Sequence, residues 1–204
     1  MTAARKRPRA IIVYRRKQPA PLPPLNAPLD AVVLCIDSAK RSGWAIYVRG
    51  VLYAYGECGD RQTDRARVVA DAVSVAYRYA IPTAMVLEVP WGGYSAAVVV
   101  SLTRSAEAWR IAWSLAGQDA ARCIERTASD WRKRLFGTRK MPREQARVLE
   151  GAYARQVVLK VRGPDHTPIG GDAAAAICIG QVIITARELL AVLGCRVVAR
   201  ERQL

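Results

Sequence analysis

At 204 residues the chain is long enough for one domain with a full hydrophobic core and a terminal extension. Its 32 Lys and Arg residues against 17 Asp and Glu residues give a net charge of +15, which favours a polyanionic partner: DNA, RNA or an anionic membrane surface. No run of about 18 apolar residues predicts a membrane-spanning helix, and five scattered cysteines with a single histidine argue against a zinc site or a disulfide framework.

The first 29 residues differ from the rest of the chain. They hold seven basic residues and no acid, and their second half is rich in proline. Because proline lacks an N–H and fixes φ, we predict an extended, mobile arm over residues 1–29 and a folded domain over 30–204. Three interpretations of the arm stay open: a tail without a specific role, a basic segment that contacts DNA, and an organellar transit or nuclear-import segment.

Hydrophobic spacing divides the remaining chain into short strands and amphipathic helices. Ser129 is the predicted cap of the shortest helix, and Pro142 stands at the start of the next one. In chain order the predicted elements are strands over 31–37, 44–49 and 51–56, a helix over 61–79, strands over 83–88 and 121–125 on either side of a helix over 96–115, and helices over 130–135, 143–159 and 172–193. This order predicts the α/β class, with a mixed five-stranded sheet and helices on both faces.

Three acidic residues stand where predicted elements begin or end. Asp37 and Glu88 each close an apolar strand, and Asp172 opens the last helix. A carboxylate at the end of an apolar strand is costly without a partner, and a metal ion is a common partner. We therefore interpret the three acids as candidate metal ligands. The alternatives are that the two strand-end acids cap a turn or pair with an arginine, and that Asp172 is a plain helix cap.

Four segments, in order, resemble the motifs of RuvC-type Holliday-junction resolvases. The motif sequences are nearest to those of bacterial and phage members. The match spans about residues 31–190. The segments are Ile36-Asp37 with residues 42–45, residues 87–91, residues 129–137 with 143–145, and residues 171–180.

The resemblance implies an RNase H-like fold and a metal-dependent, structure-selective endodeoxyribonuclease. Such an enzyme resolves Holliday junctions by paired nicks, through phosphodiester hydrolysis with two Mg²⁺ ions per active site, for which Mn²⁺ can substitute. It further implies a homodimer, which suits two symmetric cuts in a four-way DNA junction, and no membrane partner. The expected location is the cytoplasm of a bacterium or phage-infected cell, with organellar targeting left open.

The last motif departs from the family pattern. The family sequence is Asp-Ala-Ala-Asp-Ala. This chain has Asp172 at the first acidic position and Ala175, three residues later, at the place of the second acid. Residues three apart share one helix face, so both family acids would point at the same metals. In an alternative register Asp172 matches the second acid, and Asp165 or His166 supplies the first. We interpret Ala175 as an engineered Asp→Ala change; a naturally degenerate site is the competing explanation, and the genomic codon distinguishes them.

Several residues are candidate DNA contacts by resemblance and charge. Trp91 falls where the family has a base-stacking residue, with core packing as the alternative. Arg132 and Arg143 fall where the family has lysines. The other predicted phosphate contacts, which a solvated loop would also explain, are Lys133, Arg134, Arg139 and Lys140.

Two further functions remain open on the sequence. A catalytically silent protein that binds branched DNA is consistent with Ala175, and an RNase H-like nuclease could act on another nucleic acid. Metal-dependent cutting and preference for four-way junctions distinguish these functions from the resolvase.

Overall fold

A computed structural model describes residues 14–15, 31–39, 41–58, 82–90, 95–139, 141–162 and 169–184. The predicted helix over 61–79 lies outside the described residues. The elements are β1 Tyr14–Arg15, β2 Val32–Asp37, β3 Ser42–Val48, β4 Val51–Cys58, β5 Ala84–Val89, α2 Ala96–Leu115, the 3₁₀ turn η1 Ala120–Arg122, β6 Cys123–Thr127, α3 Ala128–Phe136, α4 Arg143–Arg162 and α5 Gly171–Ile183.

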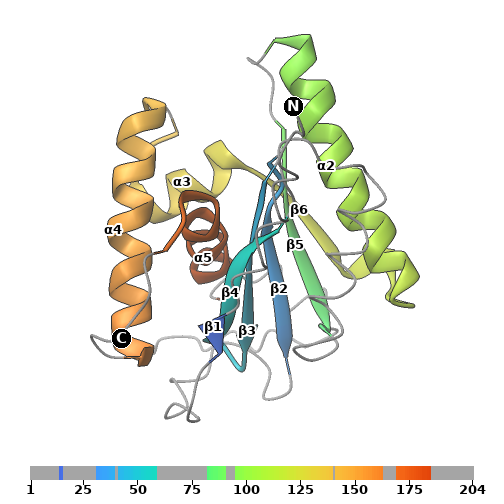
Figure 1. The fold of residues 1–204 in the computed structure, drawn as a ribbon, viewed down its shortest axis with the longest axis horizontal. Coiled ribbons are helices and arrows are strands. Elements are labelled where there is room, and N and C mark those ends of the chain that lie inside the picture. Colours follow the sequence, from blue (N-terminus) through green and yellow to red (C-terminus); the bar gives the residue numbers. More distant parts are fainter. Residues whose placement is uncertain are drawn as a thin grey trace, which may run out of the picture.

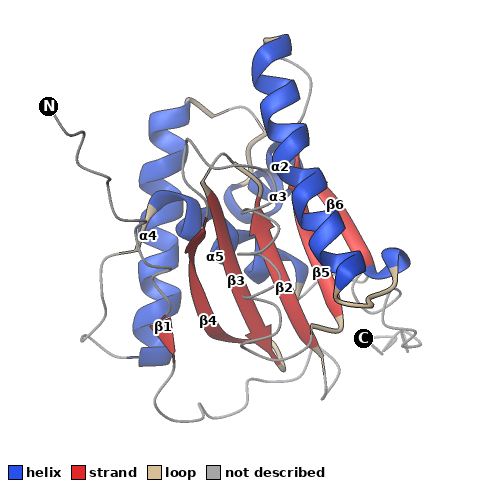
Figure 2. Ribbon diagram, turned by 45° about the vertical axis from the view of Figure 1, so that its right-hand side comes forward, coloured by secondary structure: helices blue, strands red, loops and turns tan. Residues whose placement is uncertain are grey.

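The strands form one mixed sheet in the order β1-β4-β3-β2-β5-β6 (Figure 2). β2, β3 and β4 pair antiparallel as a meander, and β5 and β6 continue the sheet parallel to β2. The five predicted strands are therefore confirmed. Within the segment predicted to be an arm, β1 adds a two-residue edge strand whose backbone pairs with β4. The boundary predicted at residue 30 stays a prediction.

The β3–β4 hairpin is formed by the predicted Arg49-Gly50 turn. Both residues have positive φ, 53° and 75°. Two successive positive φ values match the right-handed twist of the strands in a two-residue hairpin. Gly50 reaches its positive φ without strain because it has no Cβ.

Each face of the sheet packs against its own helices, because successive strand residues point to opposite sides (Figure 1). Along β2, Val33 and Cys35 join a core with α4 and α5, whereas Leu34 and Ile36 join a core with α2. The prediction of helices on both faces is confirmed. The period-two alternation also decides that Asp37, two residues after Cys35, is on the α5 side.

Several predicted boundaries differ from the structure by one to three residues. β6 begins at Cys123, because the preceding residues form a 3₁₀ turn that Asp119 caps. α3 begins at Ala128, and its cap is Thr127 rather than Ser129: the Thr127 hydroxyl accepts a hydrogen bond from the Asp130 N–H at 3.3 Å. α5 spans Gly171–Ile183, and the predicted end of this helix at residue 193 lies outside the described residues.

Two glycines let α5 lie close against the sheet. A Cβ on Gly43 of β3 would meet the Asp172 carbonyl oxygen at 1.8 Å, and one on Gly180 of α5 would meet the Tyr47 ring at 2.0 Å. The Tyr47 hydroxyl donates a hydrogen bond to the Ile177 carbonyl at 2.7 Å. The first turn of α5 therefore rests directly on the backbone of β3, which fixes the position of Asp172.

We predict that Gly43→Ala lowers the free energy of unfolding by about 1–3 kcal/mol, because backbone has to move to admit the methyl group. Gly151→Ala is the matched control: its Cβ would have a side-chain atom no nearer than 4.0 Å. In the middle of α4 it should raise the free energy by about 1 kcal/mol. Urea denaturation measures both, and a Gly43→Ala protein as stable as the parent would contradict the close approach.

Candidate active site

Five residues form a transverse row across one end of the sheet, one from each of the five long strands. β-sheet register pairs Gly43 with both Glu57 and Asp37, and Glu88 with Arg126. Ile36 pairs with Leu87, so Asp37 and Glu88 are the next residues along two adjacent parallel strands. All five share the α5 face, because the residue two positions further into each strand belongs to the α5 core; in the antiparallel β3 that residue is Ala45, which follows Gly43.

Asp172 lies above the gap that Gly43 leaves in this row. It is in the first turn of α5, where a carboxylate is favoured by the helix dipole. Its charge acts on Asp37, so the helix start and the strand end are brought together as predicted. Ala175 lies one turn further into α5 and is only 3% exposed. The metal ligation predicted for the three acids stays a prediction.

The Glu88 carboxylate is held by a tryptophan from α3. The Trp131 indole N–H donates to Oε2 of Glu88 at 2.7 Å, and the Trp131 ring is fully buried. The Ser38 hydroxyl, just after β2, donates a short hydrogen bond to the Glu88 backbone carbonyl. The ends of β2 and β5 are thereby joined, and no other described residue donates a hydrogen bond to Oε1 of Glu88.

A buried ion pair lies next to the row and was missed by sequence reasoning. Glu150 of α4 has a 4% exposed side chain, and its Oε1 accepts a hydrogen bond from Nε of Arg132 at 2.8 Å. The Arg132 guanidinium also lies over the Trp131 ring, 5.0 Å from its centre. Two adjacent α3 residues thus hold two acids, Trp131 holding Glu88 and Arg132 holding Glu150. Among the described residues, only Glu150 accepts a hydrogen bond from Arg132. This bond uses Nε, so the two terminal amino groups of Arg132 make no hydrogen bond with any described residue.

Glu57 is a further acid that the sequence did not single out. Its Oε1 accepts a long hydrogen bond, 3.4 Å, from the Ala173 N–H at the start of α5, and its other oxygen forms an ion pair with Arg41. A Cβ on Gly170 would collide with this carboxylate. Glu57 therefore caps α5 from β4. The alternation of side chains along β4 predicts that Glu57 is on the face that α5 covers. Its partner, the start of α5, is distant in sequence and could not be predicted from this pattern.

The gathered acids repel one another and resist ionisation. Burial raises the pKa of Asp37 well above its ordinary value, and the charges of Glu88 and Asp172 raise it further. Burial also raises the pKa of Glu88 to about 7, although the hydrogen bond from Trp131 lowers it. Burial and the charge of Glu57 raise the pKa of Asp172. A cation placed among these groups would relieve both the repulsion and the desolvation.

The donor set fits a hard divalent cation in its chemistry. Asp37, Glu88 and Asp172 offer carboxylate oxygens, the ligands that Mg²⁺ prefers. Within the described ranges, no three acid, histidine or cysteine side chains are close enough to hold an ion as they stand.

Basic side chains surround the acids on α3 and α4. The charges of Arg143 and Arg147 lower the pKa of Asp172, so the start of α4 lies near the start of α5. Arg143 is exposed, as are Lys133, Arg134 and Arg139. Trp91, Lys140, Asp165 and His166 lie outside the described residues, so their predicted roles stay predictions.

No helix in the described part of the chain has the length and apolar character needed to cross a bilayer.

No protein-family model matches the sequence, and no curated protein does. Solved structures of Thermus thermophilus RuvC are similar to it, one with a TM-score of 0.54 and one, in complex with a Holliday junction substrate, with 0.58. Each is 18% identical and covers 80% of this chain and 96% of its own. The yeast mitochondrial Holliday junction resolvase Ydc2 is 11% identical, with a TM-score of 0.45, and covers 84% of this chain and 82% of its own. The predicted resemblance to RuvC-type resolvases is confirmed at the level of the fold, which is the RNase H-like fold of RuvC.

Proposed function

We propose that the chain is a metal-dependent endodeoxyribonuclease that recognises four-way DNA junctions and resolves them by paired nicks. The observation that supports this most is the transverse row, because it gathers Asp37 and Glu88 at one sheet end with Asp172 above them. The fold of RuvC and the net charge of +15 agree with a DNA substrate.

Asp37, Glu88 and Asp172 would hold two Mg²⁺ ions, or Mn²⁺ in their place. When bound, such ions activate water and stabilise the leaving oxygen in phosphodiester hydrolysis. Arg132 would bind a non-bridging phosphate oxygen through its terminal amino groups, since Glu150 and the Trp131 ring hold its guanidinium in place. Arg143 would bind a neighbouring phosphate, and Trp91 an unpaired base at the junction centre.

Ala175 leaves the proposed site one carboxylate short of the family pattern. It shares a helix face with Asp172, so an aspartate there would point toward the same ions. We propose that the chain as it stands is impaired in cutting. The same residue supports the second candidate function, a protein that binds branched DNA without cutting it. An RNase H-like nuclease acting on another nucleic acid is the third.

The first experiment uses labelled four-way junctions and linear duplex with Mg²⁺. We expect Ala175→Asp to nick junctions in symmetric pairs at least 100-fold faster than the unchanged chain, because losing a direct ligand should cost at least the roughly 100-fold that an outer-shell residue can. Adding Asp37→Asn should abolish the nicks. If neither chain cuts but both bind junctions tightly, the silent binding protein is the correct function.

A second prediction concerns pH and metal. An acid whose pKa is raised on folding stabilises the protein at low pH, and the stability is lost as pH rises from its unfolded value to its folded value. For Glu88 this window runs from about 4.5 to about 7. The chelated protein should therefore lose stability between pH 5 and pH 8, and Mg²⁺ should restore more of it at pH 8 than at pH 5.

Denaturation by urea at each pH measures this effect. Glu88→Gln should make the pH profile less steep, since the amide does not titrate while Asp37 still does, and Asp37→Asn should remove most of the Mg²⁺ effect. A parent protein whose stability is level across this range, or which gains nothing from Mg²⁺ at pH 8, would refute the proposed metal site.

We also propose a homodimer formed through α2. This helix exposes Val100, Ile111 and Leu115, which lie on one side of it, and Leu115 is 65% exposed. A second copy covering this stripe would supply the second active site that two symmetric cuts need.

Sedimentation should show a dimer that Ile111→Glu with Leu115→Glu converts to a monomer, because buried unpaired carboxylates are costly. Val148→Glu is the control, since Val148 is an equally exposed apolar residue, at 67%, on α4. It should stay dimeric. Dissociation by the control alone would place the interface on α4 instead.

A further inference from the structure

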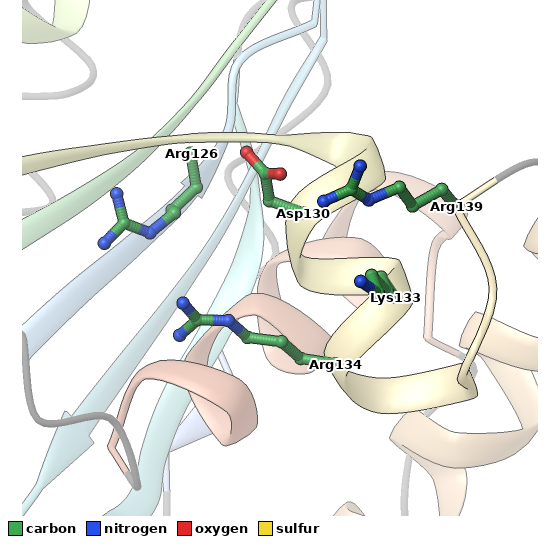
Figure 3. A pocket seen from close by; sticks show the side chains of 5 residues that line it. All are labelled: Arg126, Asp130, Lys133, Arg134 and Arg139. Carbon is green, nitrogen blue, oxygen red and sulfur yellow. The ribbon is translucent and has the colours of Figure 1, made fainter.

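A cleft whose described lining residues are all charged opens beside the acid cluster. It has a volume of about 480 Å³ and lies where β6, α3 and the loop after α3 meet. Figure 3 shows Arg126 and Arg134 extending to the same side of α3, with Asp130 between Arg126 and Arg139. The lining residues are Arg126, Asp130, Lys133, Arg134 and Arg139.

The cleft begins where the acids of the transverse row stop. Arg126 is the last residue of that row and the direct neighbour of Glu88. Adjacent strands lie roughly 4.8 Å apart, so the Arg126 backbone is about 10 Å, two strand spacings, from that of Asp37.

α3 separates the two sites and contributes to both. Trp131 and Arg132 hold acids on the active-site side of this helix, whereas Asp130, Lys133 and Arg134 line the cleft. A helix with its side chains is about 10 Å across, which agrees with the strand spacing. Groups bound at the two sites would therefore be separated by about one helix width.

The charge of the cleft selects an anion. Four cations face one carboxylate. That carboxylate is already engaged, because Oδ2 of Asp130 accepts a hydrogen bond from the Thr127 hydroxyl at 2.7 Å within the α3 cap. None of the described lining residues has an aromatic or apolar side chain on which a base could stack. Its chemistry is that of a phosphate site without base recognition.

We propose that this cleft binds one backbone phosphate of a DNA arm, one to three nucleotides from the phosphate that lies at the acid cluster. The rise along the axis of a DNA duplex is about 3.4 Å per nucleotide, so a separation of about 10 Å spans at most about three nucleotides. A strand held at both points cannot slide, so the cleft sets which phosphate reaches Asp37 and Glu88. This inference rests on the proposed function, because it takes the junction as the ligand.

The experiment combines protein variants with junctions that carry one neutral methylphosphonate. Each phosphate within five positions of the branch point is replaced in turn, and affinity is measured without Mg²⁺ so that no cutting occurs. For the unchanged chain we expect about tenfold weaker binding at one or two adjacent positions, the loss of one charged hydrogen bond. Arg134→Gln should bind the unmodified junction about tenfold less tightly and lose nothing further at those positions.

Arg155→Gln is the control, because Arg155 is an exposed arginine of α4 that bonds its own helix. It should keep the full loss at the sensitive positions. Lys133→Gln should behave as Arg134→Gln does, which excludes misfolding of one variant as the cause. If the losses are even along the arm, or if Arg134→Gln keeps them, the cleft holds no fixed phosphate, although junction preference and the proposed function survive. If the unchanged chain binds junctions no better than linear duplex, the proposed function fails and this inference with it.

Discussion

Repulsion among buried carboxylates is the constraint on which this structure depends. Period-two alternation and sheet register bring Glu57, Asp37 and Glu88 to one end and one face of the sheet, and the start of α5 adds Asp172. Burial alone would disfavour ionised groups there, and their proximity adds to the cost. The hydrogen bonds and ion pairs that surround these carboxylates offset part of this cost.

Helix α3 contributes most of these arrangements. Thr127 caps it directly after β6, so Trp131 reaches Glu88 and Arg132 reaches Glu150 from consecutive positions. The fully buried Trp131 ring anchors the helix to the sheet, while its opposite side presents cations to the cleft. One short helix thus contacts the acids on one side and presents cations on the other. A functional site that tolerates strain of this kind commonly lowers stability, and the surrounding core has to compensate.

The sequence was sufficient for the parts that local patterns determine. Apolar runs and turn residues located the strands, and the positions of Asp37, Glu88 and Asp172 at element ends indicated a common site. The Glu150–Arg132 pair could not be found in this way, because α4 and α3 meet through tertiary packing that no local period encodes. Thr127 was overlooked as a cap since two hydroxyl residues stand close together, and only backbone geometry selects between them. Gly43 was seen as part of a motif, but its role, leaving space for α5, requires the docked helix.

The proposed function requires the carboxylates at this sheet end to bind a divalent cation. The indole N–H of Trp131 reports on it directly, because it donates to Glu88. Its resonance can be assigned by Trp131→Phe and followed by nuclear magnetic resonance during a Mg²⁺ titration at pH 8. If an ion binds at the carboxylates, this one resonance should shift and reach saturation, and Asp37→Asn should abolish the shift. An indole signal that stays unchanged at millimolar Mg²⁺, or that shifts equally in Asp37→Asn, would contradict the claim.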